Sequence, residues 1–120
     1  MSNKALVCDD ALFMRSMLSK ILRGAGYEVV AEARTGVEAV AQFREHRPDL
    51  VTMDIVMPEM DGLEAVRKIV EEFPDARVVM CSAIGQEPLV AEAMRSGARA
   101  HVMKPFHPAR VLEAIERVTR

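Results

Sequence analysis

The chain has 120 residues, of which 50% are hydrophobic and 28% are charged, and its formal net charge is −2. This composition excludes a disordered chain, and the weak charge without a lysine or arginine run argues against binding to nucleic acid or to an anionic membrane. We expect one globular domain that covers residues 1–120.

The start of the chain and its cysteines favour a cytoplasmic protein. No apolar stretch is long enough for a transmembrane helix, and the first residues lead into a strand pattern without a signal-peptide profile. Cys8 and Cys81 are isolated and lack CxxC spacing, which favours two buried thiols. These features together predict a protein of the reducing cytoplasm.

Strand patterns alternate with helix patterns along the chain. Short apolar runs predict five strands, at Ala5–Cys8, Tyr27–Ala33, Leu50–Met53, Arg77–Cys81 and Ala100–Met103. Apolar residues spaced by three and four predict five intervening helices, from Phe13 to Gly24, from Thr35 to before Pro48, from Leu63 to Phe73, from Gln86 to Ser96 and from Pro108 onward. This strict alternation predicts an α/β fold with a parallel sheet and helices on both faces.

The burial of individual segments can also be predicted. The second strand is more polar than the others, which places it nearer an edge of the sheet. In the second helix, one face is expected to carry Val37, Val40 and Phe43. In the last helix, the inner face is expected to hold Val111, Leu112, Ile115 and Val118.

Polar residues follow the predicted strands at the points where the strands end. They are Asp9 and Asp10 after the first strand, Asp54 after the third, Ser82 and Ala83 after the fourth, and Lys104 and Pro105 after the fifth, with His101 three residues before Lys104. Because the carboxyl ends of parallel strands meet at one edge of a sheet, these residues are expected to share a pocket. Three carboxylates, a hydroxyl and an ammonium group suit Mg²⁺ and a phosphoryl group.

The acidic residues also have simpler interpretations. One of Asp9 and Asp10 could cap the following helix, whereas two adjacent carboxylates are most simply balanced by a divalent cation. Asp54 alone could begin a turn. Together with the aspartate pair it favours a metal site, and an aspartate can also act as a nucleophile towards phosphorus.

The residues after the last two strands allow similar alternatives. Ser82 could be an ordinary loop residue or could donate a hydrogen bond to a phosphoryl oxygen, for which the small Ala83 leaves room. Lys104 could be a solvated surface group, but at this edge it would face three carboxylates and could pair with phosphate. Pro105 cannot continue a strand, and its peptide bond is a candidate for the cis form.

Other functional motifs are absent from the sequence. It contains no P-loop and no GxSxG nucleophile elbow. The glycines at Gly24 and Gly26 follow a helix rather than a strand, which excludes a dinucleotide fingerprint. The three histidines, His46, His101 and His107, lack the spacing of zinc ligands.

The motifs taken together resemble the receiver domain of two-component response regulators, and more narrowly the stand-alone receivers of chemotaxis. The resemblance covers essentially the whole chain. It rests on Val7–Asp10 (VCDD), Phe13–Arg15 (FMR), Asp54–Pro58 (DIVMP), Met60–Gly62 (MDG), Cys81–Ala83 (CSA) and Val102–Phe106 (VMKPF). It implies a flavodoxin-like strand order 2-1-3-4-5, one receiver domain over residues 1–120 and no output domain.

The resemblance also implies roles for the site residues. Asp54 would accept a phosphoryl group from a phosphohistidine of a sensor histidine kinase. Asp10, Asp54 and the backbone carbonyl of Val56 would ligate Mg²⁺ directly, and Asp9 would hold it through water. Ser82 would bind the phosphoryl group and Lys104 would pair with it. Such a protein is a signalling switch with only weak self-catalysed phosphotransfer and autodephosphorylation, not an enzyme.

The resemblance further implies how the signal leaves the site. Ser82 would move towards the phosphoryl group, the ring of His101 would rotate into the vacated space, and the face built from the fourth helix, fifth strand and fifth helix would change. The expected output partner of this monomer is the flagellar motor switch, with a phosphatase acting on the phosphorylated form.

Two other functions compete with this interpretation. One is a phosphorelay shuttle to a histidine phosphotransfer protein. The other is a haloacid-dehalogenase-type phosphatase. That family has a second aspartate two residues after its nucleophile, whereas this chain has Val56 at that position.

Three positions depart from the usual receiver pattern. His101 stands where Tyr or Phe is commoner, and because imidazole titrates near neutral pH we hypothesise that output binding depends on pH between roughly 6 and 8. Val56 and Ile84 stand where one acidic or amide residue often orients the attacking water. We therefore hypothesise slowed dephosphorylation, with a partner phosphatase inserting the missing polar group.

Overall fold

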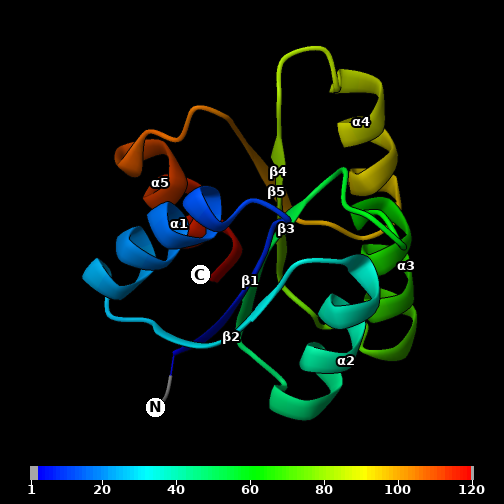
Figure 1. Ribbon diagram of the computed structural model, residues 1–120, viewed down its shortest axis with the longest axis horizontal. Helices are drawn as coiled ribbons and strands as arrows, with labels where there is room; N and C mark the ends of the chain where they lie inside the picture. Colours follow the sequence, from blue (N-terminus) through cyan, green and yellow to red (C-terminus); the bar gives the residue numbers. More distant parts are fainter. Residues whose placement is uncertain (1–2, 120) are drawn as a thin grey trace.

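Five strands and five helices alternate along the chain in the computed structural model, which describes residues 3–119 (Figure 1). They are β1 (Lys4–Cys8), α1 (Leu12–Gly24), β2 (Glu28–Ala33), α2 (Gly36–His46), β3 (Leu50–Asp54), α3 (Gly62–Glu72), β4 (Val78–Ser82), α4 (Glu87–Arg95), β5 (Ala100–Met103) and α5 (Pro108–Thr119). All strand pairs are parallel and the order is β2-β1-β3-β4-β5. The predicted fold class and strand order are therefore confirmed.

The helices cover both faces of the sheet. Helices α1 and α5 lie on one face, and α2, α3 and α4 lie on the other (Figure 1). Successive strand residues alternate between the two cores, as the pleat of a strand requires. In β1, for example, Leu6 and Cys8 belong to the core under α2–α4, whereas Ala5 and Val7 belong to the core under α1 and α5.

Burial along the strands follows their place in the sheet. All five residues of the central strand β3 are buried, whereas β2, at one edge, is mostly half-buried or exposed. The predicted edge position of the second strand is thus confirmed. Cys8 and Cys81 are free buried thiols, as expected, and they face opposite cores.

One predicted core residue, Leu112, is wrong, and Val37 lies off the buried face of α2 that holds Val40 and Phe43. Val37 is 48% exposed and Leu112 is 38% exposed. In α2 the buried stripe consists of Gly36, Ala39, Val40 and Phe43, and in α5 it consists of Val111, Ala114, Ile115 and Val118. Both exposed residues directly adjoin a stripe residue, and the turn of about 100° per residue takes them off the buried face. The fourth strand also lies one residue later than predicted.

A closely packed loop joins β3 to α3 beside the carboxyl edge of the sheet. The Gly62 N–H donates to the carbonyl oxygen of Ile55 over 2.7 Å, and the Asp61 side chain caps α3 by accepting from the Glu64 N–H. A Cβ atom at Gly62 would overlap the carbonyl oxygen of Asp54. The loop can therefore approach the end of β3 only because residue 62 has no side chain.

Among the helices of the described residues, none combines the length and apolarity that would let it cross a membrane.

Candidate functional site

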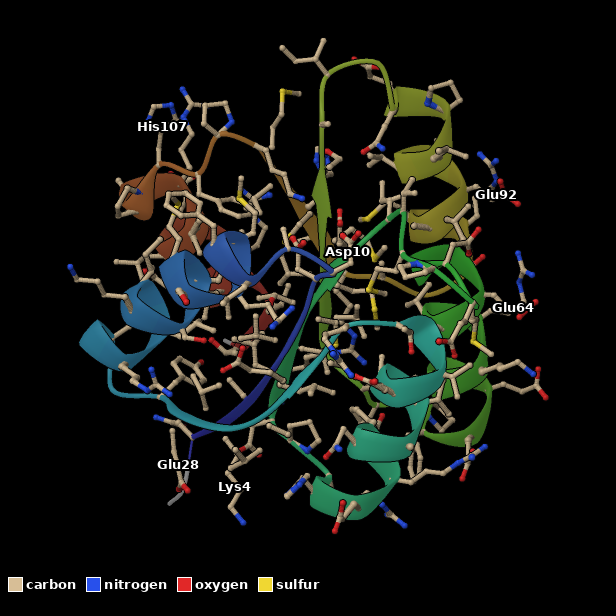
Figure 2. The ribbon with its side chains drawn as sticks, in the orientation of Figure 1. Lys4, Asp10, Glu28, Glu64, Glu92 and His107 are labelled. Atoms are coloured by element: carbon tan, nitrogen blue, oxygen red, sulfur yellow. The ribbon has the colours of Figure 1, made fainter. Side chains whose placement is uncertain are left out.

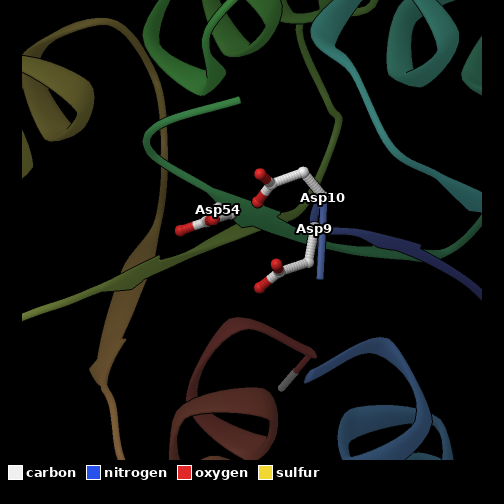
Figure 3. A group of neighbouring side chains, drawn as sticks. All are labelled: Asp9, Asp10 and Asp54. Atoms are coloured by element: carbon white, nitrogen blue, oxygen red, sulfur yellow. The ribbon is translucent and has the colours of Figure 1, made fainter. Parts of the chain in front are cut away.

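Three carboxylates meet at the carboxyl edge of the sheet. Asp9 and Asp10 follow β1 and Asp54 ends β3, and each offers an oxygen within 4.8 Å of the others (Figure 3). Asp9 is fully buried and Asp54 is 6% exposed, whereas Asp10 is open to solvent. Lys4 and Glu28, at the amino ends of β1 and β2, lie at the opposite edge of the sheet from Asp10 (Figure 2).

An ammonium group bridges two of these acids. Lys104 directly follows β5, and its Nζ lies 3.0 Å from Asp9 Oδ2 and 3.3 Å from Asp54 Oδ1. Its backbone N–H donates to the Ser82 carbonyl over 2.7 Å, and its peptide bond to Pro105 is cis. Burial disfavours the charged amine, but the two carboxylates outweigh this effect and raise the pKa of Lys104.

The environment of Asp54 raises its pKa to about 6. Burial is the main cause, because it disfavours the ionised form of the Asp54 carboxyl group. The negative charge of the nearby Asp9 is the second cause, because it repels a negative charge on Asp54. Lys104 and the Ile55 N–H, which donates to Asp54 Oδ1 over 3.0 Å, act in the opposite direction. Asp54 is therefore a carboxylate whose charge is only partly compensated by the protein.

The arrangement fits a divalent cation. Asp9 Oδ2 is buried and accepts no well-aligned hydrogen bond, although Lys104 Nζ forms an ion pair with it. Three carboxylates face one ammonium group, so the protein alone leaves excess negative charge at this edge. Clustered carboxylate oxygens are the donors that Mg²⁺ prefers. Val56, the fourth predicted ligand residue, lies two residues after Asp54 and is 55% exposed.

Ser82 and Ala83 occupy the predicted place at the end of β4. Ser82 is 2% exposed and pairs in register with Met103 of β5. The Ala83 N–H donates to Gln86 Oε1 over 2.7 Å, so a phosphoryl oxygen at this N–H would displace the Gln86 amide. Sequence reasoning missed Gln86, since it reads as an ordinary first residue of a helix.

The predicted switch residues lie around one hollow beside the site. The side chain of His101 is exposed on β5. A cavity of about 340 Å³ is lined by Ser82, Ala83, Glu87, Val90, Ala91, Met94, His101 and Met103. The structure therefore places His101 and Ser82 on the same cavity, between α4 and β5.

Arg15 of α1 is a second residue that sequence reasoning left without a role. It is 8% exposed, and its Nη1 donates to the Asp9 carbonyl oxygen over 2.8 Å. The sequence did show that Arg15 lies near the start of a helix, one turn after Ala11 and close to the aspartate pair. Nothing in the sequence showed that the guanidinium would turn back to the end of β1.

This fold and site define a class, namely a flavodoxin-like α/β domain with an acidic cluster and a lysine at the carboxyl edge of its sheet. Residues 5–116 match the family of the response regulator receiver domain, and the chain belongs to this family. It is therefore a signalling domain of two-component systems rather than a classical enzyme.

Relatives narrow the subfamily to CheY homologues. The chain is 48% identical over 120 residues to chemotaxis protein CheY of Thermotoga maritima, with all of both chains covered. It is 51% identical over 117 residues to chemotaxis protein CheY of Bacillus subtilis, with 98% of each covered. It also superposes with a TM-score of 0.93 and 36% identity on the CheX–CheY–BeF₃–Mg²⁺ complex from Borrelia burgdorferi, covering 98% of this chain and 89% of that one.

Proposed function

We propose that this receiver is a switch that takes a phosphoryl group on Asp54 from the phosphohistidine of a sensor histidine kinase. The observation that carries the proposal is the position of Asp54, a nearly buried carboxylate with Lys104 on one side and the Asp9–Asp10 pair on the other. Its partly uncompensated charge makes the carboxylate available as a nucleophile.

Mg²⁺ is the cation we propose for the acidic cluster. Asp10, Asp54 and the backbone carbonyl of Val56 would hold it directly, and Asp9 would hold it through water. When bound, it would neutralise charge on the transferring phosphoryl group. The related structure from Borrelia burgdorferi, whose name includes BeF₃ and Mg²⁺, supports this assignment.

The transfer step follows from the side chains at the site. An Asp54 carboxylate oxygen forms a bond to phosphorus while the bond between phosphorus and the donor imidazole nitrogen breaks. The imidazole keeps the electron pair and takes up a proton. Lys104 pairs with the phosphoryl oxygens, and Ser82 and the Ala83 N–H donate hydrogen bonds to them. Such a step needs positioning and charge neutralisation rather than elaborate covalent chemistry. We therefore expect self-catalysed phosphotransfer and autodephosphorylation to be weak.

The output is a change of the face formed by α4, β5 and α5. Phosphorylation adds an acceptor-rich charge at Asp54, towards which Ser82 moves. His101 then rotates into the space beneath, which the shared cavity supports. A partner that prefers this state shifts the population towards it.

We propose the flagellar motor switch as the output partner of this monomer. The support is that relatives from Thermotoga maritima and Bacillus subtilis, matched over almost their full length, are named chemotaxis proteins. In the related structure from Borrelia burgdorferi a CheY forms a complex with a separate protein, CheX. We propose that this chain also has a second partner, a phosphatase that acts on the phosphorylated form.

One experiment tests the central proposal. The purified chain is treated with Mg²⁺ and acetyl phosphate, and the modified residue is located by mass spectrometry, with Asp54→Asn as the control. A phosphoryl group on Asp54 is expected. Phosphate on another residue, or no modification, would overturn the assignment. Binding of motor-switch protein to the two forms, compared by pull-down, tests the output partner separately.

A further inference from the structure

Arg15 is a buried cation that the phosphoryl-transfer chemistry does not use. It lies on the first turns of α1, its side chain is 10% exposed, and its Nε donates to Glu32 Oε1 of β2 over 2.8 Å. Its Nη1 donates to the main-chain carbonyl of Asp9 over 2.8 Å. One guanidinium therefore ties together α1, the edge strand β2 and the end of β1.

The consequence falls on the backbone that carries the aspartate pair. The Asp9 N–H donates to the Ala33 carbonyl over 2.9 Å, and Asp9 Oδ1 accepts from the Ala11 N–H over 2.9 Å. With the Arg15 contact, the N–H, the carbonyl and one carboxylate oxygen of Asp9 are all held by neighbouring groups. Because Asp9 leads directly into Asp10, these contacts set the direction in which the chain leaves β1.

The position of the Asp10 side chain depends on this backbone more strongly than the position of the Asp9 side chain does. Asp10 is exposed, and no hydrogen bond or ion pair to another described residue fixes its side chain. Its place in the acidic cluster is thus set by the Asp9–Ala11 segment. A ligand whose side chain has no protein partner is held in position only by its main chain.

We propose that Arg15, braced by Glu32, is a positioning residue that orients the Asp9–Asp10 segment for cation binding. This inference rests on the proposed function, because it concerns the same Mg²⁺ site. Arg15 acts through the Asp9 carbonyl and does not touch the cation. Contacts that orient metal ligands from behind alter metal affinity by about 10- to 100-fold when they are removed.

Positioning and simple electrostatics predict opposite effects at this residue. Arg15 is a positive charge near a cation site, so its removal would tighten Mg²⁺ binding if charge alone mattered. If Arg15 instead orients the Asp9–Asp10 segment, its removal weakens Mg²⁺ binding. The paired change Arg15→Gln with Glu32→Gln removes one positive and one negative charge, which leaves the net charge unchanged and isolates the positioning effect.

The test measures the Mg²⁺ dissociation constant of the unphosphorylated chain by isothermal titration calorimetry. We expect the R15Q/E32Q variant to bind Mg²⁺ about tenfold more weakly than the wild type. The matched control is R44Q/E72Q, which removes an exposed ion pair of 2.9 Å between α2 and α3 and should leave the dissociation constant unchanged. Arg15→Gln alone should also weaken binding, against the electrostatic expectation.

Thermal unfolding without Mg²⁺ separates positioning from a merely structural role. A lowered melting temperature with a wild-type dissociation constant in R15Q/E32Q would overturn the inference and leave the proposed function intact. Failure of the wild type itself to bind Mg²⁺ would instead overturn the proposed function. Should R15Q/E32Q not fold, Glu32→Asp decides the question. It keeps the charge at a half-exposed position but shortens the brace, and an unchanged dissociation constant there would refute the positioning role.

Discussion

Replacing Asp54 by Asn should make the metal-free protein more stable at neutral pH. Burial and the Asp9 charge raise the pKa of Asp54 from its ordinary 3.8 to about 6. Each unit of difference between the folded and unfolded pKa corresponds to about 1.36 kcal/mol, so the ionised side chain costs the folded state about 3 kcal/mol. The attraction of Lys104 is already included in this net value, and an amide oxygen can still accept the Ile55 N–H.

The pH dependence has a definite sign. Between pH 3.8 and about 6 the folded state keeps a proton on Asp54 that the unfolded state has released. This contribution to stability is therefore present below that window and is lost as the pH rises through it. The advantage of the Asp54→Asn variant over the wild type should be near zero at pH 4 and approach about 3 kcal/mol above pH 7.

Urea unfolding followed by circular dichroism in EDTA measures this difference directly at several pH values. Adding Mg²⁺ should reduce the stability difference between the variant and the wild type. A ligand present at 100 times its dissociation constant stabilises the folded protein by about 2.7 kcal/mol, and the wild type should gain this stabilisation. The variant lacks one carboxylate ligand and should gain less. An Asp54→Asn variant no more stable than the wild type at pH 7.5, or an advantage independent of pH, would refute the reasoning.

Three further substitutions test other parts of the structure. Gly62→Ala should cost about 3 kcal/mol, because the new Cβ overlaps the Asp54 carbonyl, whereas Gly24→Ala meets open space and should not lower the melting temperature. Val56→Asn, at an exposed position, should shorten the lifetime of the phosphorylated form by orienting the attacking water, and an unchanged hydrolysis rate would count against this role. His101→Phe should change the affinity of the phosphorylated form for its output partner, because His101 lines the same cavity as Ser82, and an unchanged affinity would count against a switch role of this residue.

The fold was predictable because strand and helix periods alternate cleanly and because the polar strand β2 could be assigned to an edge. The meeting of Asp9, Asp10 and Asp54 followed from parallel topology alone, since each ends or follows a strand of one sheet. Leu112 was wrongly assigned to the core because it lies next to the buried stripe of α5. Hydrophobicity alone does not show whether an apolar residue at the border of such a stripe is buried or exposed.

Contacts made by long side chains could not be predicted in this way. The periodicity of α1 predicts the position of the Arg15 backbone but not the contact between its guanidinium group and the Asp9 carbonyl. This contact depends on the side-chain rotamer and on the spacing between helix and sheet. The same holds for Gln86, whose amide covers the Ala83 N–H. These contacts belong to tertiary packing, which a one-dimensional pattern does not contain.

The contacts of Lys104 explain why cation and phosphoryl group should stabilise each other. In the unphosphorylated protein its ammonium is shared between Asp9 and Asp54. A phosphoryl group on Asp54 brings oxygens with a charge of about −1.5 to −2 and draws Lys104 towards them. Asp9 Oδ2 is then left buried without its cation, a costly state unless a metal ion compensates it. Binding of one therefore favours the other, and by linkage the phosphorylated form should bind Mg²⁺ more tightly to the same degree that Mg²⁺ favours phosphorylation.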